Sequence, residues 1–222
     1  MSIKITYSNK ANNKSSGNLV LFTDEKFNIS NLKKYTSNTE FSYIKDLLKT
    51  SDLTKNIFVF EINSKKKILL ISIKKDLKRV DIENLGAEFY RYINYGKNSE
   101  YFISSESIIG KHENYTDYFL HGLKLKSYEF NKYKTKKEAR LISINVLGNK
   151  NKSSIQNKLK FKALEEGIFY ARDLVSEPGN ILHPDEYAKR LNSLRKDGLK
   201  VNIYNEKKLK KLGMNALLGV GM

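Results

Sequence analysis

The chain has 222 residues and a formal net charge of +17, and 40% of its residues are hydrophobic. This length fits one large domain or two small ones, and the apolar fraction is too high for a wholly disordered protein. Because the sequence contains no cysteine, disulfide frameworks, thiolate zinc sites and cysteine nucleophiles are excluded.

The sequence carries no recognisable membrane or export signal. No run of about 18 apolar residues is present. The first residues, Met1 to Thr6, lack the basic-then-apolar layout of a signal peptide. We therefore expect a protein that stays in the cytoplasm and does not contact a membrane.

The basic excess comes mostly from lysine, with 41 basic residues against 24 acidic ones. Spread over the whole chain beside abundant Asn, Ile and Tyr, it favours the composition of an A- and T-rich genome. A nucleic-acid surface is the alternative, and it usually needs clustered charge. The local clusters are short and flank apolar runs, which is typical of solvated turns and helix faces. They are Lys65-Lys66-Lys67, Lys74-Lys75, and Lys207-Lys208 with Lys210-Lys211.

The first hundred residues alternate between strand-like and helix-like segments. Ile3, Ile5 and Tyr7 alternate with polar residues, and the apolar run at residues 19–22 follows a Gly/Asn/Ser-rich turn, so strands are predicted at residues 3–7 and 19–22. Residues 57–62 and 68–73 are nearly continuous apolar runs rich in β-branched residues, which is typical of central strands covered on both faces. A helix is predicted from residue 81, where apolar residues share one face. These are Ile82, Leu85, Phe89, Tyr92 and Ile93.

Three further elements complete this part of the chain. A short strand is predicted at residues 101–103, and a helix at 115–125 that ends near Ser127. A third segment, residues 141–146, reads as a strand closed by Gly148-Asn149. Alternating strands and helices predict one compact α/β domain, with a mixed sheet flanked by helices, over residues 1–150.

A second unit is predicted from Ser153, which has capping-box spacing to Gln156. The helix that follows has an unusually wide apolar face, so it is expected to make contacts on more than one side. Its two stripes are Ile155, Leu159 and Ala163, and Phe161, Leu164, Ile168, Ala171 and Val175. Pro178-Gly179 is predicted to end the helix.

Four shorter segments follow this helix. Residues 184–196 predict a helix, residues 200–204 a strand after a turn at Gly198, and residues 206–212 a short helix. Residues 216–222 are apolar and glycine-spaced, and we expect them to form a strand that is cut off inside a core.

Few residues have the spacing of a known reactive site. The three histidines, at positions 112, 121 and 183, lack the i, i+4 spacing of a helical metal site, which favours ordinary core or surface histidines. Gly110-Lys111 does not complete a phosphate-binding loop. The earlier glycine is replaced by Ser105, and His112 stands where Ser or Thr would hold magnesium.

An acidic cluster surrounds the only two prolines of the chain. Helix-end capping and turn chemistry are the preferred interpretation, with catalysis as the alternative. The four residues are Asp173, Glu177, Asp185 and Glu186.

The sequence around this cluster resembles the leucyl aminopeptidase family at three ordered segments. Residues 171–180 (ARDLVSEPGN) with 183–188 (HPDEYA) resemble the segment that joins the accessory and catalytic domains of that family. Residues 212–221 (LGMNALLGVG) resemble the first stretch of its catalytic domain. Upstream, residues 127–136 (SYEFNKYKTK) resemble a tyrosine- and lysine-rich stretch of the accessory domain. The first hundred residues share only the α/β pattern.

The resemblance implies a cytoplasmic metallopeptidase that removes amino-terminal residues from peptides and is usually hexameric. It implies a macro-domain-like accessory domain, and a catalytic domain with two divalent cations, commonly zinc, manganese or magnesium. We therefore expect an accessory domain at residues 1–150, a connecting helix and linker at 151–180, and an incomplete α/β catalytic domain at 181–222. The family's catalytic motifs would lie beyond Met222, so no catalytic, cofactor-binding or metal residue is assigned in this chain.

Two other functions remain open. A basic accessory domain could bind DNA, as in some bacterial members of the family, and the net charge permits weak, non-specific binding. A macro-domain-like fold could instead bind a nucleotide, although no glycine-rich phosphate loop supports this.

Overall fold

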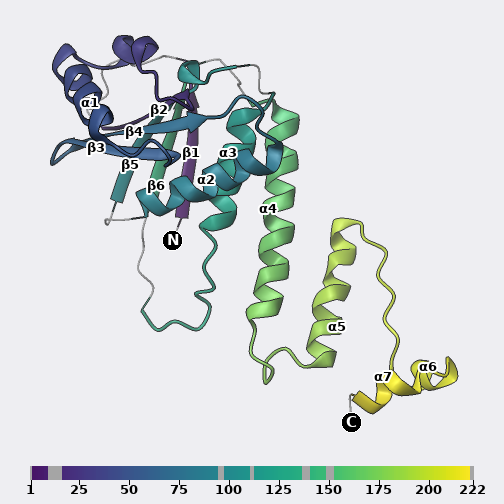
Figure 1. Ribbon diagram of the computed structural model, residues 1–222. Coiled ribbons are helices and arrows are strands. Elements are labelled where there is room, and N and C mark those ends of the chain that lie inside the picture. Colours follow the sequence, from purple (N-terminus) through teal and green to yellow (C-terminus); the bar gives the residue numbers. More distant parts are fainter. Residues whose placement is uncertain are drawn as a thin grey trace. The chain divides into compact units, whose positions relative to one another are not determined.

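A six-stranded sheet with strand order β1-β6-β5-β2-β4-β3 forms the centre of the computed structural model (Figure 1). The structure describes residues 2–9, 17–94, 98–110, 113–136, 141–148 and 153–220. Five strands are parallel, and β3 pairs with β4 in the antiparallel direction. The strands are β1 (Ser2–Ser8), β2 (Asn18–Asp24), β3 (Ile57–Asn63), β4 (Lys66–Ile73), β5 (Asn98–Ser104) and β6 (Leu141–Leu147). All six predicted strands of this part are confirmed, and so is the mixed α/β fold.

The position of β3 differs from the sequence interpretation. β4 lies inside the sheet, as predicted, but β3 is an edge strand with β4 as its only neighbour. The residues of β3 are apolar because both faces of the strand pack against other side chains, although only one of its edges is hydrogen-bonded to another strand. Ile57 belongs to the apolar cluster on one face of the sheet, and Phe60 to the cluster on the other face.

Helices cover the two faces of the sheet (Figure 1). One face carries the 3₁₀ helix η1 (Ser30–Tyr35) and α1 (Asn38–Thr50), which pack over Leu21 and Leu70. The other face carries α2 (Arg79–Ile93) and α3 (Tyr115–Lys126), which confirm the two helices predicted here. η1 and α1 were not predicted. A reciprocal capping box starts α1, in which the Ser37 hydroxyl accepts from the Glu40 amide and the Glu40 carboxylate accepts from the Ser37 amide.

Helices α2 and α3 approach each other closely because each has a glycine at the crossing. A Cβ atom on Gly86 would lie less than 3.0 Å from the carbonyl oxygen of Phe119, and one on Gly122 would lie less than 3.0 Å from that of Glu83. Real Cβ atoms do not approach backbone this closely, so only glycine permits this backbone-to-backbone contact. The pair fixes α3 on the sheet.

The remaining elements are helical. They are the 3₁₀ helix η2 (Ser105–Ser107), α4 (Ile155–Ser176), α5 (Pro184–Ser193), the 3₁₀ helix η3 (Leu194–Asp197), α6 (Glu206–Lys211) and α7 (Asn215–Val220). The chain divides into two compact units, Met1–Phe169 and Tyr170–Met222, and the division falls within α4. The domain scheme of 1–150, 151–180 and 181–222 therefore stays a prediction. Within the described ranges, no helix combines the length and the apolar character needed to cross a bilayer.

Three sequence expectations in the second half are wrong. Residues 200–204 form no strand, and residues 215–220 form a helix instead of a strand. No described strand adjoins either segment, and a strand without a hydrogen-bonded neighbour is not stable in water. The cap of α4 is Ser154 rather than Ser153, since the Asn157 amide donates to the Ser154 hydroxyl over 3.0 Å. Residues 221 and 222 lie outside the described residues, as do His112 and Asn149.

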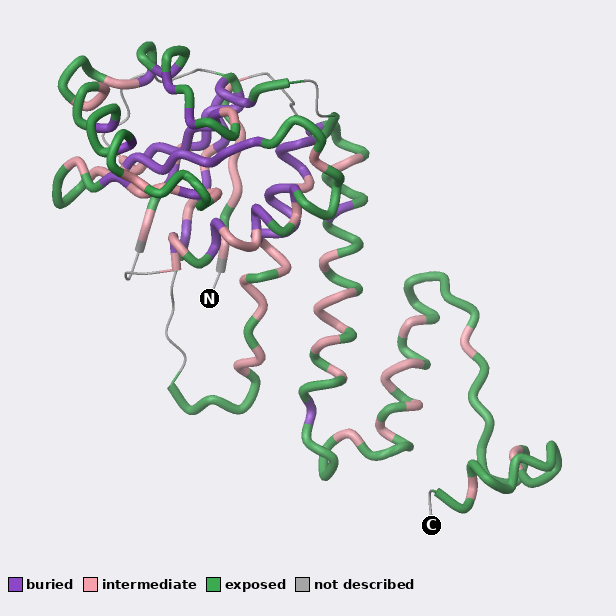
Figure 2. Tube along the Cα trace, in the orientation of Figure 1, coloured by how far each residue is buried: buried purple, intermediate pink, exposed green. Residues whose placement is uncertain are grey.

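Burial differs between the two units (Figure 2). Buried residues, in purple, lie on the sheet and on α2 and α3, whereas α5, α6 and α7 are drawn as exposed or intermediate. Within described residues 170–220 no apolar side chain is buried. Ile155, Leu159 and Val175 on α4 are 80%, 64% and 87% exposed. The predicted wide apolar face of α4 is thus largely uncovered in this chain, with Phe161 as its buried residue.

Candidate functional site

The acidic cluster is organised by an arginine that the sequence interpretation did not include. The Arg190 guanidinium contacts the Glu177 carboxylate over 2.8 Å and the Glu186 carboxylate over 3.0 Å. The Glu177 side chain is only 1% exposed. Tyr170 adds a hydrogen bond from its hydroxyl to the Arg190 carbonyl. Glu177 and Tyr170 therefore tie α5 to the end of α4, whereas the pair of Glu186 with Arg190 lies within α5.

The predicted helix-end capping by these acids stays a prediction, since α5 has no side-chain cap hydrogen bond and the contacts that Glu177 and Glu186 make are ion pairs. The hydrogen bonds that Arg190 donates to Glu177 and to Glu186 raise the pKa of Arg190 above its usual value. A hydrogen bond from Arg190 is the main cause that lowers the pKa of Glu186. Asp185 lies in the exposed first turn of α5, where a negative charge favours the helix amino terminus. Charges that neutralise one another in this way are poor general acids or bases at neutral pH.

The two described histidines, His121 and His183, lie in positions that belong to the fold. His121 is 95% buried, and its Nδ1 lies 2.9 Å from Glu83 Oε1, so this contact links α3 to α2. Its ring packs on Phe161 with centroids 5.0 Å apart. His183 is the residue before α5. Among the residues that the structure describes, no group of three or more His, Asp or Glu side chains converges in a way that could hold a metal.

The carboxyl ends of the parallel strands form the usual ligand crevice of such sheets, next to the point where the connections change direction. Here the buried serines of η2 follow β5 at the point between β5 and β2. The Ser107 hydroxyl accepts from the Phe22 amide over 2.9 Å and donates to the Ser104 carbonyl. The Ser105 hydroxyl donates to the Leu147 carbonyl. These hydroxyls are used within the fold.

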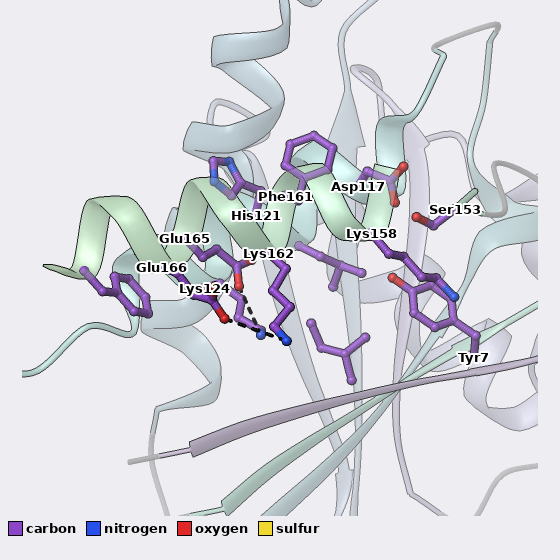
Figure 3. Close-up of a pocket in the computed structure, with 13 residues that line it drawn as sticks. Tyr7, Asp117, His121, Lys124, Ser153, Lys158, Phe161, Lys162, Glu165 and Glu166 are labelled. Carbon is purple, nitrogen blue, oxygen red and sulfur yellow. Dashed lines mark hydrogen bonds and ion pairs between the residues drawn. The ribbon is translucent and has the colours of Figure 1, made fainter. Parts of the chain in front are cut away.

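A pocket of about 410 Å³ lies within the first unit, between β1, α3 and α4 (Figure 3). Its walls come from positions more than 100 residues apart in the chain. Lys158 and Tyr7 meet at one end beside Asp117 and Ser153, and the Lys158 ammonium sits 4.0 Å from the centre of the Tyr7 ring. At the other end lie the ion pairs of Lys124 with Glu165, at 3.2 Å, and of Lys162 with Glu166, at 3.8 Å. Ile5, Leu120, Phe161 and Phe169 supply the apolar lining.

The electrostatics of this pocket act on the Tyr7 phenol. Burial raises the pKa of Tyr7 to about 12, the carboxylates of Asp117 and Glu165 add to this increase, and a hydrogen bond with Ser153 opposes it. Each of these raising effects disfavours the negatively charged phenolate. Tyr7 therefore keeps its proton at neutral pH and faces the pocket as a neutral hydroxyl.

The raised pKa of Tyr7 predicts a loss of stability at alkaline pH. The folded state holds the Tyr7 proton up to about pH 12, while the unfolded chain releases it near 10.0. Between these values the native state binds more protons, so the free energy of unfolding falls as pH rises. Comparing chemical unfolding of the wild type and Tyr7→Phe from pH 9 to about 11.5 should show a smaller decline in the variant. Equal declines in both proteins would contradict this assignment.

The lysine clusters lie where they were predicted, in turns and on helix surfaces. Lys65 sits in the β3–β4 turn, and Lys74 and Lys75 follow β4. On α6, Lys210 pairs with Glu206 over 2.6 Å.

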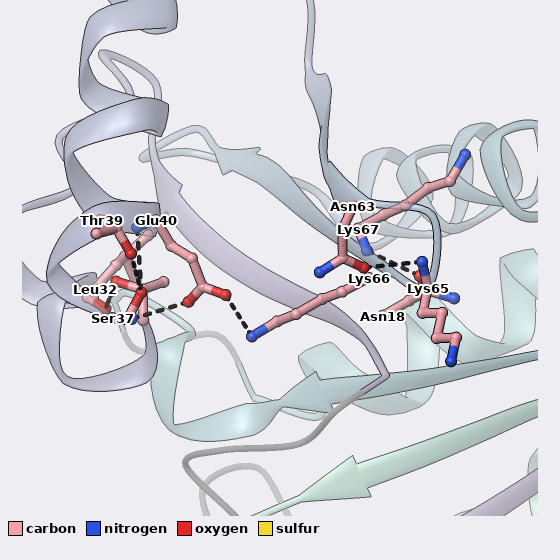
Figure 4. A network of polar contacts seen from close by, with 10 residues as sticks. Asn18, Leu32, Ser37, Thr39, Glu40, Asn63, Lys65, Lys66 and Lys67 are labelled. Carbon is pink, nitrogen blue, oxygen red and sulfur yellow. Dashed lines mark hydrogen bonds and ion pairs between the residues drawn. The ribbon is translucent and has the colours of Figure 1, made fainter.

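Lys66 is an exception to this exposure (Figure 4). Its ammonium is 2.7 Å from the Glu40 carboxylate, and the two side chains are only 16% and 14% exposed. Burial raises the pKa of Glu40, but hydrogen bonds from Lys66 and from the Ser37 backbone outweigh it and lower the pKa overall. The neighbouring Lys67 pairs with Glu61 over 2.6 Å. Two lysines of this cluster are therefore already neutralised within the fold.

Comparison with protein families matches residues 169–222 to the "Cytosol aminopeptidase family, catalytic domain". A probable cytosol aminopeptidase of Bradyrhizobium sp. is 41% identical over 104 residues, which cover 45% of this chain and 21% of the relative. One from Agrobacterium fabrum is 42% identical over 108 residues, covering 46% of this chain and 22% of the relative. The chain thus spans about a fifth of the length of the curated relatives it matches.

Solved structures share the fold over nearly the whole chain. A mutant of tomato leucine aminopeptidase aligns with a TM-score of 0.68 and 18% identity over 96% of this chain and 46% of that protein. The cytosol aminopeptidase of Coxiella burnetii aligns with a TM-score of 0.62 and 15% identity over 93% of this chain and 41% of that protein. Residues 169–222 thus match the catalytic domain of the cytosol aminopeptidase family, the curated relatives match a little under half of the chain, and the fold of the solved leucine aminopeptidase is shared over nearly all of it.

Proposed function

We propose that this chain is the amino-terminal portion of a metal-dependent enzyme that removes amino-terminal residues from peptides. The observation that carries the proposal is the match of residues 169–222 to the family's catalytic domain, behind a sheet domain that shares the fold of leucine aminopeptidases. In the complete enzyme we expect a homo-hexamer in the cytoplasm. Residues 1–150 would form the accessory domain, residues 151–180 the connecting helix and linker, and residues 181–222 the start of the catalytic domain.

The metal chemistry is assigned to other parts of the enzyme. The family's two divalent cations, manganese, zinc or magnesium, would supply an activated water and stabilise the oxyanion. The described residues of this chain do not fit such a pair. Glu177 and Glu186 are held by Arg190, and His121 is held by Glu83, so these donors are already engaged. We therefore assign these side chains to contacts that hold the fold together and not to metal binding. Arg190, through its ion pair with Glu177, would fix the linker between the two predicted domains.

The proposal makes an all-or-none prediction for the purified chain. Residues 1–222 should not hydrolyse leucine para-nitroanilide or leucyl peptides, with or without added manganese, zinc or magnesium, because activation of water requires a held cation. Calorimetric titration with manganese should likewise give no tight binding. Turnover that survives stringent purification and disappears in Glu177→Ala or Asp185→Ala would contradict the proposal.

For nucleic acid we propose only weak, non-specific binding. The net charge of +17 supports some attraction, but Lys66, Lys67 and Lys210 are paired with carboxylates. Scattered lysines bind through counterion release, so the affinity should fall steeply between about 50 and 200 mM salt. Filter binding with two unrelated duplexes of equal length tests this expectation. Binding that prefers one sequence and persists at the higher salt concentration would instead establish a dedicated DNA-binding role.

A further inference from the structure

We propose that the pocket between β1, α3 and α4 binds a small zwitterion with an apolar side chain, that is, a free α-amino acid. The proposal stands on the chemistry of the pocket. Only its biological meaning, the sensing of a peptidase product, rests on the proposed function.

The charge balance of the lining selects the ligand class. Lys124, Lys158 and Lys162 face Asp117, Glu165 and Glu166, so three positive charges meet three negative ones. A phosphate or nucleotide site needs surplus positive charge, and a metal site needs converging carboxylates. A balanced pocket favours a ligand that carries one charge of each sign.

Two of these charges remain available for a ligand. Lys124 and Lys162 are each paired with a glutamate. Lys158 instead lies over the Tyr7 ring at 4.0 Å, and no ion pair joins it to a described carboxylate. An ammonium on an exposed aromatic face is held less strongly than one in a charge-assisted hydrogen bond. A ligand carboxylate would therefore be favoured at Lys158.

Asp117 offers the complementary charge. This residue is 95% buried, and its carboxylate accepts 3.0 Å from the Asn157 amide nitrogen. A carboxylate has about four lone-pair positions, and a buried one is strongly stabilised by a cation. No described lysine or arginine forms an ion pair with it. A ligand ammonium fits here, with the Tyr7 and Ser153 hydroxyls gathered at the same end of the pocket (Figure 3).

The middle of the pocket accommodates the ligand's side chain. Ile5, Leu120 and Phe161 give the pocket apolar walls beside its polar ends. The volume of about 410 Å³ lies within the range of small-ligand sites and exceeds what one amino acid fills. Apolar amino acids such as leucine should thus bind better than glycine.

Calorimetry on the full chain with L-leucine tests the proposal. L-leucine should bind at one site, whereas leucinamide, which lacks the carboxylate, and 4-methylpentanoate, which lacks the ammonium, should each bind at least about tenfold more weakly. Inorganic phosphate should not compete with leucine. The proposal fails if leucine gives no binding, if either analogue binds as well as leucine, or if phosphate displaces it.

Two variants locate the site. Lys158→Met changes an exposed residue and should weaken leucine binding by about tenfold or more without unfolding the chain. Asp117→Asn should do the same, with circular dichroism to confirm its fold. Lys49→Met is the matched control, since Lys49 is an exposed lysine on α1 that pairs with Asp46. Unchanged binding in Lys158→Met would overturn the proposal. None of these readouts uses catalysis, so such a failure would leave the proposed peptidase role intact.

Discussion

Replacing Gly86 by alanine is expected to lower the free energy of unfolding by about 3 kcal/mol, near the upper end of what overpacking usually costs. The added methyl group would overlap the Phe119 carbonyl, which is backbone and cannot move aside like a flexible side chain. Gly122→Ala should have an effect of similar size, because its Cβ would meet the Glu83 carbonyl. Both helices would have to separate along the crossing that holds α3 on the sheet.

Thermal melts followed by circular dichroism measure this effect. A loss of this size corresponds to a midpoint lower by about 6–12 °C for a chain of this length. Gly167→Ala is the matched control, because Gly167 lies within α4 and a Cβ there would meet nothing within 4 Å. That control should be stabilised by up to about 1 kcal/mol through helix propensity. Gly86→Ala melting at the wild-type temperature would show that α2 and α3 do not cross as described.

The sequence predicted those elements whose patterns are strong within a short window. The apolar run at residues 68–73 and the helical spacing from Ile82 to Ile93 became β4 and α2. α1 was missed although Ser37 and Glu40 have capping-box spacing, because its exposed face interrupts the apolar pattern. Residues 200–204 have the alternation of a strand, but alternation alone supplies no hydrogen-bonded neighbour.

Features that depend on distant pairing were beyond sequence reasoning. The edge position of β3 follows from strand order, which the apolar content of residues 57–62 does not encode. The contact between Glu177 and Arg190 joins two helices across a proline-rich turn. The pocket likewise needs Tyr7 and Lys158 to meet, and only the parallel pairing of β1 with β6 brings the two ends of the first unit together. The charged residues that line this pocket carried no prediction from the sequence.

The assignment of residues 169–222 to the start of a peptidase domain can be tested by exchange. In the relative from Agrobacterium fabrum, the residues that match this segment would be replaced by residues 169–222 of this chain. The chimera should retain manganese-dependent hydrolysis of leucine para-nitroanilide within about tenfold of the unmodified relative, because a tenfold change corresponds to only about 1.4 kcal/mol of transition-state stabilisation.

A second chimera that carries Glu177→Ala provides the internal comparison. Loss of the Glu177 carboxylate leaves Arg190 without its buried partner, so the linker should lose its fixed geometry and the activity should fall by at least about a further tenfold. Lys189→Ala, an exposed substitution on the same helix as Arg190, should have no such effect.

The most direct measurement is kcat/KM of the first chimera, which carries residues 169–222 unchanged, relative to the parent enzyme. A value within tenfold supports the assignment, whereas a folded chimera without metal-dependent activity would contradict it.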